Sequence, residues 1–297
     1  MPGPVDTTIR SAKATSAAPA APPASAVAAP TPPPLIHAKK PGPWFQFLSA
    51  KDFEWTVAEL PVAHLPDELQ DLRLLHLSDF HARARWDPAY DDLIRLVQRH
   101  PPDLILFTGD FVEHKFDYRP GFPTVKRLLD QLKTRLGCFA IPGNHDGALC
   151  RGPLAQLPVT MVDHRRLLLP VGGATLEIIG LGGITRREID LPFIQSIGAK
   201  PPRSVRIVLS HFPDHLRRVA FLEPDLFLCG HTHGGQVCFP GRFPLLRHDS
   251  LPRRLFRGIH YTGGTWLVPN RGLGFSGIVP FRLFCPAEVI EIRLRKM

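Results

Sequence analysis

Five short apolar segments of this chain each lead directly into residue types that bind metal ions. The polar groups after these segments are Asp79 with His81, Asp110, Asn144 with His145 and Asp146, His211, and His231 with His233. In α/β proteins, ligands bind at the carboxyl ends of neighbouring strands, along one rim of the sheet. The pattern therefore predicts that these side chains meet on one rim.

The spacing of apolar residues predicts an α/β fold. Strands are expected at 74–77, 104–107 and 139–141, with helices at 89–99 and 124–136 between them. The second half is expected to hold strands at 176–181, 205–209, 226–229, 258–262, 265–268 and 289–294. Short strands that alternate with helices are typical of α/β domains.

Two pairs of candidate ligands are separated by a single residue. In an extended chain, residues i and i+2 point to the same side. Asp79 and His81 are therefore expected to converge, and so are His231 and His233. A lone histidine beside a strand is more often structural, and His76, inside the first strand, is expected to belong to the core.

Adjacent side chains diverge in the segment that follows the third strand. If the amide oxygen of Asn144 binds a metal, the neighbouring His145 is expected to face the substrate. Gly109, Gly143 and Gly230 each precede a candidate ligand. Because glycine has no Cβ, we expect these positions to allow a sharp turn and a close approach of the backbone to the metals.

The charge of the chain is unevenly distributed. The chain has 36 basic and 27 acidic residues, a net charge of +9, and residues 242–297 contribute ten basic and three acidic residues, or +7. An excess of this kind favours an anionic partner such as a phosphorylated substrate, an anionic membrane or a nucleic acid. A solvated basic face explains it equally well.

The cysteines and the hydropathy pattern favour a cytoplasmic protein. The five cysteines contain no CxxC pair, which argues against a disulfide framework or a zinc knuckle. No run of eighteen apolar residues predicts a membrane span. We expect cytoplasmic residence, either free or peripheral to the inner face of the membrane.

The chain is expected to divide into a tail, residues 1–50, and a catalytic domain, residues 51–297. Residues 1–34 are rich in alanine and proline and predict disorder. The stretch 39–48 combines lysines with aromatic residues and either meets a membrane surface or fastens the tail to the domain. The segment 239–258 mixes apolar residues with five arginines, as in a lipid-facing flap or a packed loop.

The motifs resemble those of the calcineurin-like metallophosphoesterase superfamily. The series is Asp79-x-His81, Gly109-Asp110, Gly143-Asn144-His145-Asp146, His211 and Gly230-His231-Thr232-His233. The run 230–237 and the segments 271–274, 280–282 and 286–289 resemble the YkuE-like branch, which is similar to bacterial enzymes that cleave UDP-2,3-diacylglucosamine in lipid A biosynthesis. The resemblance implies two packed mixed β-sheets flanked by helices, an α-β-β-α sandwich.

The resemblance also implies a binuclear centre. Asp79, His81 and His233 would bind one metal, Asn144, His211 and His231 the other, and Asp110 would bridge them. Ligands without a thiolate favour two Mn²⁺ ions, with Fe or Zn as alternatives. A bridging hydroxide would attack phosphorus, and His145 would protonate the leaving oxygen or stabilise the transition state. Asp146 would orient His145. Glu113 stands where many relatives have aspartate.

Three functions are compatible with these motifs. The favoured one is hydrolysis of a lipid-linked or nucleotide-sugar phosphoester or pyrophosphate such as UDP-2,3-diacylglucosamine. A broad-specificity phosphodiesterase or nuclease uses the same chemistry, although no nucleic-acid-reading module is present in the sequence. A protein-binding scaffold without activity is disfavoured because the set of ligands is complete. The substrate-binding residues and the oligomeric state are not predicted.

Overall fold

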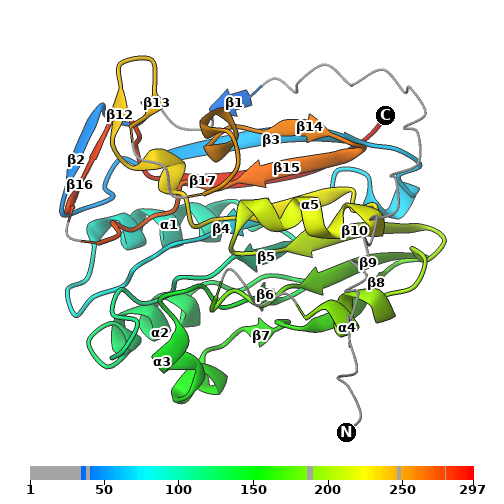
Figure 1. Cartoon of the computed structure of the whole chain (residues 1–297), viewed down its shortest axis with the longest axis horizontal. Helices are drawn as coiled ribbons and strands as arrows, with labels where there is room; N and C mark the ends of the chain where they lie inside the picture. Colours follow the sequence, from blue (N-terminus) through cyan, green and yellow to red (C-terminus); the bar gives the residue numbers. More distant parts are fainter. Residues whose placement is uncertain (1–34, 38–40, 186–189, 246–248, 278) are drawn as a thin grey trace, which may run out of the picture.

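Two mixed β-sheets form the centre of the molecule in a computed structural model (Figure 1). The structure describes residues 41–185, 190–245, 249–277 and 279–297, together with the backbone of 35–37. The first sheet contains, in spatial order, β1 (Leu35–His37), β3 (Glu54–Val62), β17 (Glu288–Lys296), β4 (Arg73–Leu77), β5 (Leu104–Phe107), β6 (Cys138–Ala140) and β7 (Thr160–Met161). The second contains β14 (His260–Thr262), β15 (Thr265–Pro269), β11 (Leu226–Cys229), β10 (Ser204–Leu209), β9 (Ala174–Gly180) and β8 (Arg165–Val171).

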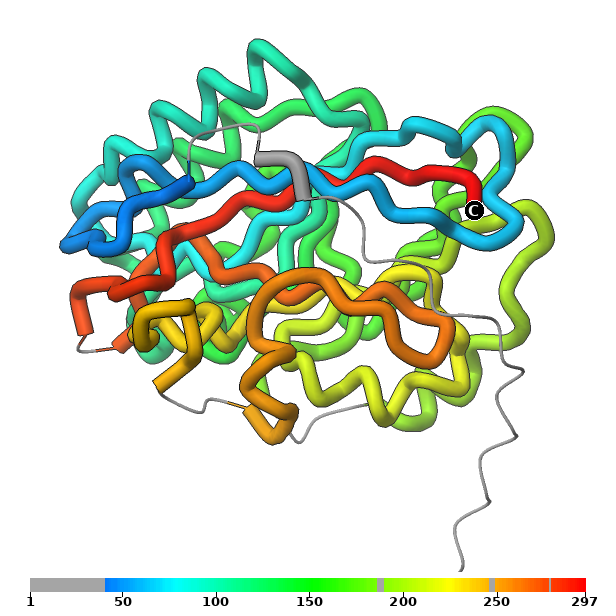
Figure 2. Tube along the Cα trace, turned by 90° about the horizontal axis from the view of Figure 1, so that it is seen from above, coloured from blue at the N-terminus to red at the C-terminus, as the bar shows by residue number. Residues whose placement is uncertain are grey.

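Parallel strands occupy the middle of both sheets. Strands β4, β5, β6 and β7 are parallel in the first sheet, and β9, β10, β11 and β15 are parallel in the second. The carboxyl ends of these strands therefore lie on a common side of each sheet. Strand β17 runs antiparallel to β4 and parallel to β3, and Figure 2 shows β3 and β17 side by side.

The main core lies between the two sheets. One cluster of buried apolar side chains joins Leu74 and Leu106 of the first sheet to Ile207, Leu228 and Trp266 of the second. Burying a leucine or isoleucine contributes roughly 1.5–3 kcal/mol, so this layer is a large part of the free energy that holds the sheets together.

Helices cover the outer face of each sheet. Helices α1 (Pro88–Arg99) and α2 (Phe122–Asp130) share a buried cluster with the first sheet, and α4 (Leu191–Ser196) and α5 (Leu216–Val219) share one with the second. The short α3 (Gly147–Cys150) follows the third ligand segment. The predicted α-β-β-α sandwich is confirmed.

Most expected elements occur near their predicted positions, with ends that differ by one or two residues, and the largest difference is at the end of α2. Helix α2 stops at Asp130 instead of reaching residue 136. The Thr134 hydroxyl bonds both the N–H and the carbonyl of Gly137, at 3.1 and 2.7 Å, which offers the backbone an alternative to the helix. Strand β14 begins at His260, after Gly258, whose φ of 77° departs from extended backbone.

Two small two-stranded sheets project at one end of the molecule (Figure 1). Strand β2 (Phe45–Phe47) pairs with β16 (Phe281–Leu283), and β12 (Cys238–Phe239) pairs with β13 (Phe243–Pro244). A bridge between Val237 and Leu283 links these two sheets.

The predicted boundary at residue 50 stays a prediction. Strands β1 and β2 lie within residues 1–50, while residues 1–34 and 38–40 fall outside the described residues. No described helix has the length and apolar character needed to cross a membrane.

Candidate metal centre

The predicted ligands come together where strands of both sheets end. Strands β4, β5 and β6 of the first sheet lead into Asp79 and His81, Asp110, and Asn144. Strands β10 and β11 of the second lead into His211, and into His231 and His233. The site therefore lies at the junction of the two sheets, and both must pack correctly to form it.

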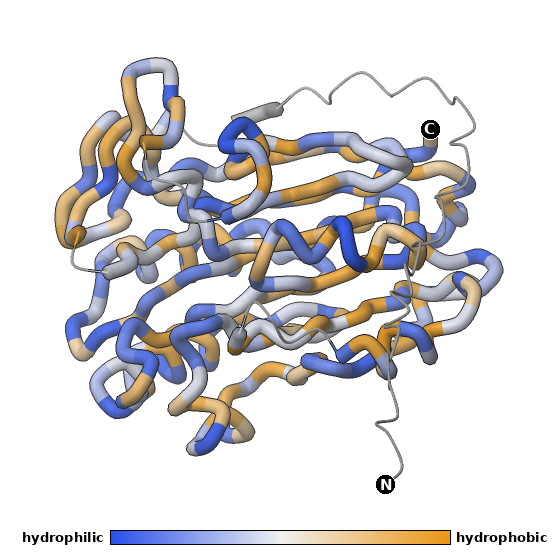
Figure 3. Tube along the Cα trace, in the orientation of Figure 1, coloured by the Kyte–Doolittle hydropathy of each residue, from blue (hydrophilic) through white to orange (hydrophobic). Residues whose placement is uncertain are grey.

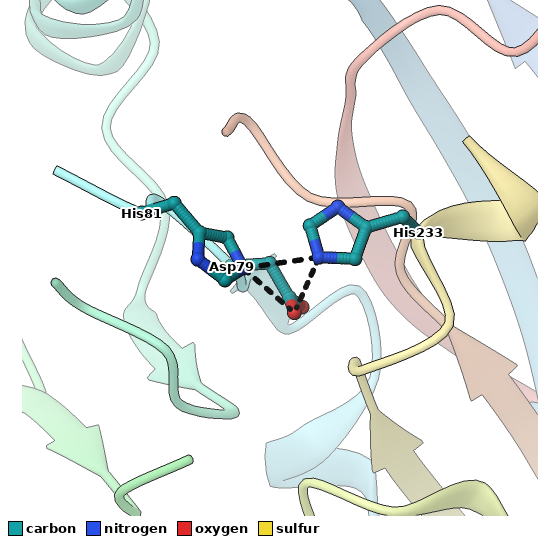
Figure 4. A group of neighbouring side chains, drawn as sticks. All are labelled: Asp79, His81 and His233. Atoms are coloured by element: carbon teal, nitrogen blue, oxygen red, sulfur yellow. Dashed lines mark hydrogen bonds and ion pairs between the residues drawn. The ribbon is translucent and has the colours of Figure 1, made fainter. Parts of the chain in front are cut away.

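Asp79, His81 and His233 form the first group of ligand atoms (Figure 4). The Nε2 atoms of the two imidazoles lie 3.0 Å apart. Asp79 Oδ1 lies 3.3 Å from Nε2 of His233 and 3.8 Å from Nε2 of His81. All three side chains are buried, so their polar atoms face one another with little access to water.

Asn144, His211 and His231 form a second group. The amide oxygen of Asn144 lies 3.0 Å from Nε2 of His211 and 2.9 Å from Nδ1 of His231. His211 is buried, while the other two side chains are partly exposed. This group is therefore on the more open side of the site.

Asp110 lies between the two groups. Its Oδ2 atom is 3.4 Å from Nε2 of His81 and 3.3 Å from Nε2 of His211. Its Oδ1 atom accepts a hydrogen bond of 2.8 Å from the backbone N–H of His145. One carboxylate oxygen thus faces a nitrogen of each group, which is the position that a shared ligand requires.

The paired ligands converge in a different way from the one predicted. Asp79, His81, His231 and His233 have φ angles of 50°, 44°, 67° and 50°, in the left-handed region, so these segments are not extended chain. The i, i+2 argument from an extended strand is therefore wrong. Left-handed backbone at residues other than glycine costs about 1–3 kcal/mol and persists where the surrounding structure imposes it, often at functional sites.

Glycines allow the ligand segments to touch. A Cβ on Gly143 would lie 2.2 Å from Asp110 Oδ1, and one on Gly230 would lie 2.2 Å from Asp79 Oδ2. The predicted close approach at these glycines is thus an approach to the ligand carboxylates, which any larger residue would displace.

Partners behind the rings fix which ring nitrogen faces the site. His211 donates from Nδ1 to the carbonyl oxygen of Thr108 at 2.7 Å, which leaves Nε2 toward Asn144 and Asp110. The carboxylate of Glu113 lies 2.7 Å from Nδ1 of His81, which turns Nε2 of that ring toward Asp110. Carboxylate or carbonyl partners of this kind orient metal-binding histidines and increase their basicity.

The donor set fits a pair of divalent ions. Two buried carboxylates, one amide oxygen and four imidazoles converge on two adjacent points, and ligand atoms of Asp79, Asp110 and His211 form a further compact group. Buried charges of this density are costly unless they are paired or coordinate metal. The arrangement supports the predicted division into two sites with Asp110 between them.

Comparison with known proteins agrees with this geometry. A family model described as calcineurin-like phosphoesterase matches residues 72–235, which include every candidate ligand. The chain belongs to the calcineurin-like phosphoesterase family. This calcineurin-like phosphoesterase is 29% identical over 272 residues to phosphodiesterase YaeI of Escherichia coli, covering 87% of this chain and 91% of that protein.

Two further proteins resemble this calcineurin-like phosphoesterase. The uncharacterized metallophosphoesterase YkuE of Bacillus subtilis is 26% identical over 259 residues, covering 84% of this chain and 88% of that protein. The structure of 5'-nucleotidase from Candida albicans has a TM-score of 0.41 and 10% identity, covering 76% of this chain and 47% of that chain. The family model and the two relatives by sequence, YaeI and YkuE, indicate a hydrolase of phosphate esters.

Neighbouring carboxylates raise the pKa values of two of the candidate ligand histidines. Burial alone would lower the pKa of His81, but Asp79, Glu113 and Asp110 raise it to about 10. Burial alone would also lower the pKa of His211, but Asp110 and Asp79 raise it to about 9. Conversely, burial would raise the pKa values of Asp79 and Asp110, yet the neighbouring imidazoles hold both well below the usual range.

The other two candidate ligand histidines have lowered pKa values. Burial, with the nearby His211, lowers the pKa of His231 to about 3. Burial also lowers the pKa of His233 to about 4, although Asp79 opposes this. A divalent ion must therefore displace protons chiefly from His81 and His211, so its uptake releases protons and weakens as the pH falls.

His145 lies beside both groups but contributes no atom to either. Its Nδ1 lies 2.5 Å from the carbonyl oxygen of Glu113, and its ring meets that of His81 edge-on, with centroids 4.7 Å apart. A ring that donates from Nδ1 to a carbonyl presents Nε2 as its other hydrogen-bonding atom. This arrangement is compatible with the predicted contact to substrate.

Asp146 does not have the role that we predicted. Its carboxylate accepts hydrogen bonds from the backbone N–H groups of Phe111, Val112 and Gly143, at 2.9, 3.2 and 2.8 Å, whereas the His145 ring is held by a carbonyl. Asp146 therefore fastens the segment after Asp110 to the segment before Asn144. Its side chain is buried, which, with the charge of Asp110, raises its pKa to about 7.

Two functional contacts were not predicted from the sequence. One is the carboxylate of Glu113 against His81. The other is the buried guanidinium of Arg282, which contacts Nδ1 of His233 at 3.2 Å and donates to the carbonyl oxygens of Arg271 and Gly274, at 2.7 and 2.6 Å. The available signals were the place of Arg282 in the branch motif 280–282 and the aspartate that many relatives have at the position of Glu113. Neither residue type nor spacing marks a supporting residue by itself.

Proposed function

We propose that this protein hydrolyses a phosphodiester or pyrophosphate bond in a lipid-linked or nucleotide-sugar substrate such as UDP-2,3-diacylglucosamine. The observation that carries the hydrolytic part is the convergence of seven oxygen and nitrogen donors from both sheets beside His145. The phosphodiesterase name of the Escherichia coli relative supports the same class of bond.

We assign metal binding to seven residues and proton transfer to His145. Two divalent ions, for which Mn²⁺ is our first choice and Fe or Zn the alternatives, would neutralise the phosphate charge and supply a nucleophile at neutral pH. Asp79, His81 and His233 hold one position, Asn144, His211 and His231 hold the other, and Asp110 serves both. His145, held through Nδ1 by the Glu113 carbonyl, protonates the departing oxygen from Nε2.

A surface that we call the aromatic edge supports a lipid-linked substrate. It comprises Trp44, Phe45, Phe47, Leu48, Phe239, Phe243 and Leu245, each between 43% and 65% exposed. The edge is formed by the two small sheets, which are joined where the N–H of Leu283 donates to the carbonyl of Gln236 at 3.0 Å. Figure 3 shows apolar stretches in both projecting two-stranded sheets.

The aromatic edge is suited to a membrane surface. Exposed apolar side chains gathered on one surface mark interaction sites, and aromatic rings favour the bilayer interface. We therefore place the protein in the cytoplasm, with peripheral contact to the inner face of the membrane. Lys39, Lys40 and residues 246–248 of the predicted flap lie outside the described residues.

Removing apolar side chains from the aromatic edge should reduce the hydrolysis of lipid-linked substrates more than that of water-soluble substrates. In a variant carrying Phe239→Ser, Phe243→Ser and Leu245→Ser, hydrolysis of UDP-2,3-diacylglucosamine in anionic vesicles should fall by about 10²-fold or more. Each side chain contributes about 1.5–3 kcal/mol when it is withdrawn from water. The measurement is kcat/KM in the presence of vesicles.

The matched control for this variant is Phe221→Ser, because Phe221 is 60% exposed and lies in the turn Ala220–Leu222, away from the edge. It should keep wild-type activity on the vesicle-borne substrate. An equal loss in the control and the edge variant, or no loss in either, would remove the aromatic edge as support for a lipid-linked substrate.

The function itself is tested by assaying protein loaded with Mn²⁺. We expect release of UMP from UDP-2,3-diacylglucosamine, and slower hydrolysis of bis(p-nitrophenyl) phosphate, both abolished by EDTA. Hydrolysis of many diesters and of single-stranded nucleic acid, with no preference for the lipid-linked substrate, would favour a broad phosphodiesterase or nuclease. No hydrolysis of any phosphoester by the metal-loaded protein would overturn the proposal.

A further inference from the structure

A cleft lies between the chain segment that carries His81 and the aromatic edge. The cleft has a volume of about 170 Å³, and His81 forms part of its lining. Its walls come from the residues after β2, the start of α1 and the loop before β16, and they include Leu48, Trp86, Phe275 and Pro280. The cleft thus runs from a candidate metal ligand to an exposed residue of the edge.

The polar groups in the cleft are mainly cationic. Arg83 and Arg85 line it, and the Arg83 guanidinium lies 3.3 Å from the Glu113 carboxylate that contacts His81. Arg83 is therefore linked to the candidate ligand His81 through the carboxylate of Glu113.

The carboxylate of Asp87, which also lines the cleft, is engaged elsewhere. It accepts hydrogen bonds from the hydroxyl of Ser49 at 2.6 Å and from the N–H groups of Ala50 and Ala89 at 2.8 and 2.9 Å. These bonds cap α1 and fasten the residues after β2 to it. Asp87 consequently holds the wall of the cleft together, with both carboxylate oxygens engaged in these hydrogen bonds.

The indole of Trp86 is fixed and has an unused donor. The guanidinium of Arg127 lies over its ring at 4.1 Å, and Tyr90 meets it edge-on at 5.2 Å. Its Nε1 is buried and has no acceptor among the described residues. The indole therefore forms a rigid and largely apolar part of the cleft wall.

We propose that this cleft binds the apolar ester group of an amphiphilic phosphodiester or pyrophosphate whose phosphorus lies at the metal centre. The inference rests on the proposed function and assigns it a substrate-binding site. An acyl or alkyl chain contacts Leu48, Phe275 and Pro280, while Arg83 and Arg85 meet anionic oxygens. The chain then leaves the cleft at the aromatic edge, toward the membrane.

Two diesters that differ only in the retained group test this site. Methyl and n-octyl p-nitrophenyl phosphate share a leaving group, so the ratio of their kcat/KM values reports contacts to the chain. Below the micellar concentration and without vesicles, the wild-type protein should prefer the octyl ester by about tenfold or more, because each buried methylene contributes about 0.8 kcal/mol. Leu48→Asp should bring this ratio close to one.

Leu168→Asp is the matched control, because Leu48 and Leu168 are both 49% exposed and Leu168 lies on β8, outside the cleft. The control should keep the wild-type ratio. A wild-type ratio near one, or a ratio that Leu48→Asp does not change, overturns the cleft assignment and leaves the proposed function intact, since the methyl ester reports the metal centre alone.

Equilibrium binding tests the cleft independently of turnover. Octylphosphonate should bind with a Kd about tenfold or more below that of methylphosphonate, measured through quenching of tryptophan fluorescence, and Leu48→Asp should remove the difference. Equal affinities would overturn the assignment even if both esters are hydrolysed. Absence of hydrolysis with a preserved affinity difference would instead remove the proposed function and keep the apolar cleft.

Discussion

Replacing Asp110 with asparagine should abolish phosphodiester hydrolysis and lower the metal content of the protein. The Oδ2 atom of Asp110 lies 3.4 and 3.3 Å from ring nitrogens of His81 and His211, one in each group, so its charge serves both positions. Metal ions contribute several kcal/mol to such reactions, and each 1.36 kcal/mol is a factor of ten. We expect kcat/KM to fall by at least about 10³-fold.

The measurements are elemental analysis after exhaustive dialysis and kcat/KM for bis(p-nitrophenyl) phosphate. Asp130→Asn provides the control, because Asp130 is a partly exposed carboxylate that pairs with Lys126 at 2.9 Å, away from the site. It should retain wild-type metal content and rate. Full metal occupancy together with wild-type turnover in Asp110→Asn would refute the assignment of Asp110 as the shared ligand.

His145→Ala should keep the metals and slow the reaction. The His145 ring is held by the Glu113 carbonyl, and neither ligand group includes it. A positioned acid contributes about 10²–10⁴-fold, so kcat for UDP-2,3-diacylglucosamine should fall by that amount. The loss should be smaller for nitrophenyl esters, whose leaving group needs little protonation.

The control for this variant is His114→Ala, which removes an exposed imidazole two residues after Val112 and should leave both rates unchanged. A different result is informative. Ligand atoms of His81, Glu113 and His145 also lie within 4.8 Å of one another. If His145→Ala loses metal, an ion is bound by the group of His81, Glu113 and His145, and His145 is a metal ligand instead of an acid.

Many of the strands, and the candidate ligands that come together, could be predicted from the sequence because both leave strong local signals. Strands β3 and β8 were not among the expected elements. Apolar runs such as 104–107 and 226–229 coincide with β5 and β11, and the polar group after each run identifies its end at the rim. The pairing of strands is not local. That β17 lies between β3 and β4 depends on contacts between distant segments, and nothing in its apolar pattern specifies its neighbours.

The errors concern backbone conformation and supporting contacts. The left-handed φ angles of Asp79 and His81 are imposed by tertiary packing, such as the hydrogen bond of 2.9 Å from the N–H of Asp79 to the carbonyl of Gly109. Asp146 was expected beside His145 because carboxylates often orient imidazoles. In the fold, its carboxylate instead meets three backbone N–H groups that only the tertiary structure places there.

The position of β17 in the first sheet has a consequence for the order of folding. The indole of Trp55 on β3 donates to the carboxylate of Glu291 on β17 at 3.2 Å across 236 residues of sequence, whereas β4, β5 and β6 follow one another closely. Closing long loops slows folding, so the β4–β6 unit is expected to form before β17 reaches it. Until then the edge of β4 has unpaired N–H and carbonyl groups, a template for pairing between chains. Early intermediates of this protein should therefore be prone to aggregate at β4, the strand that leads to Asp79.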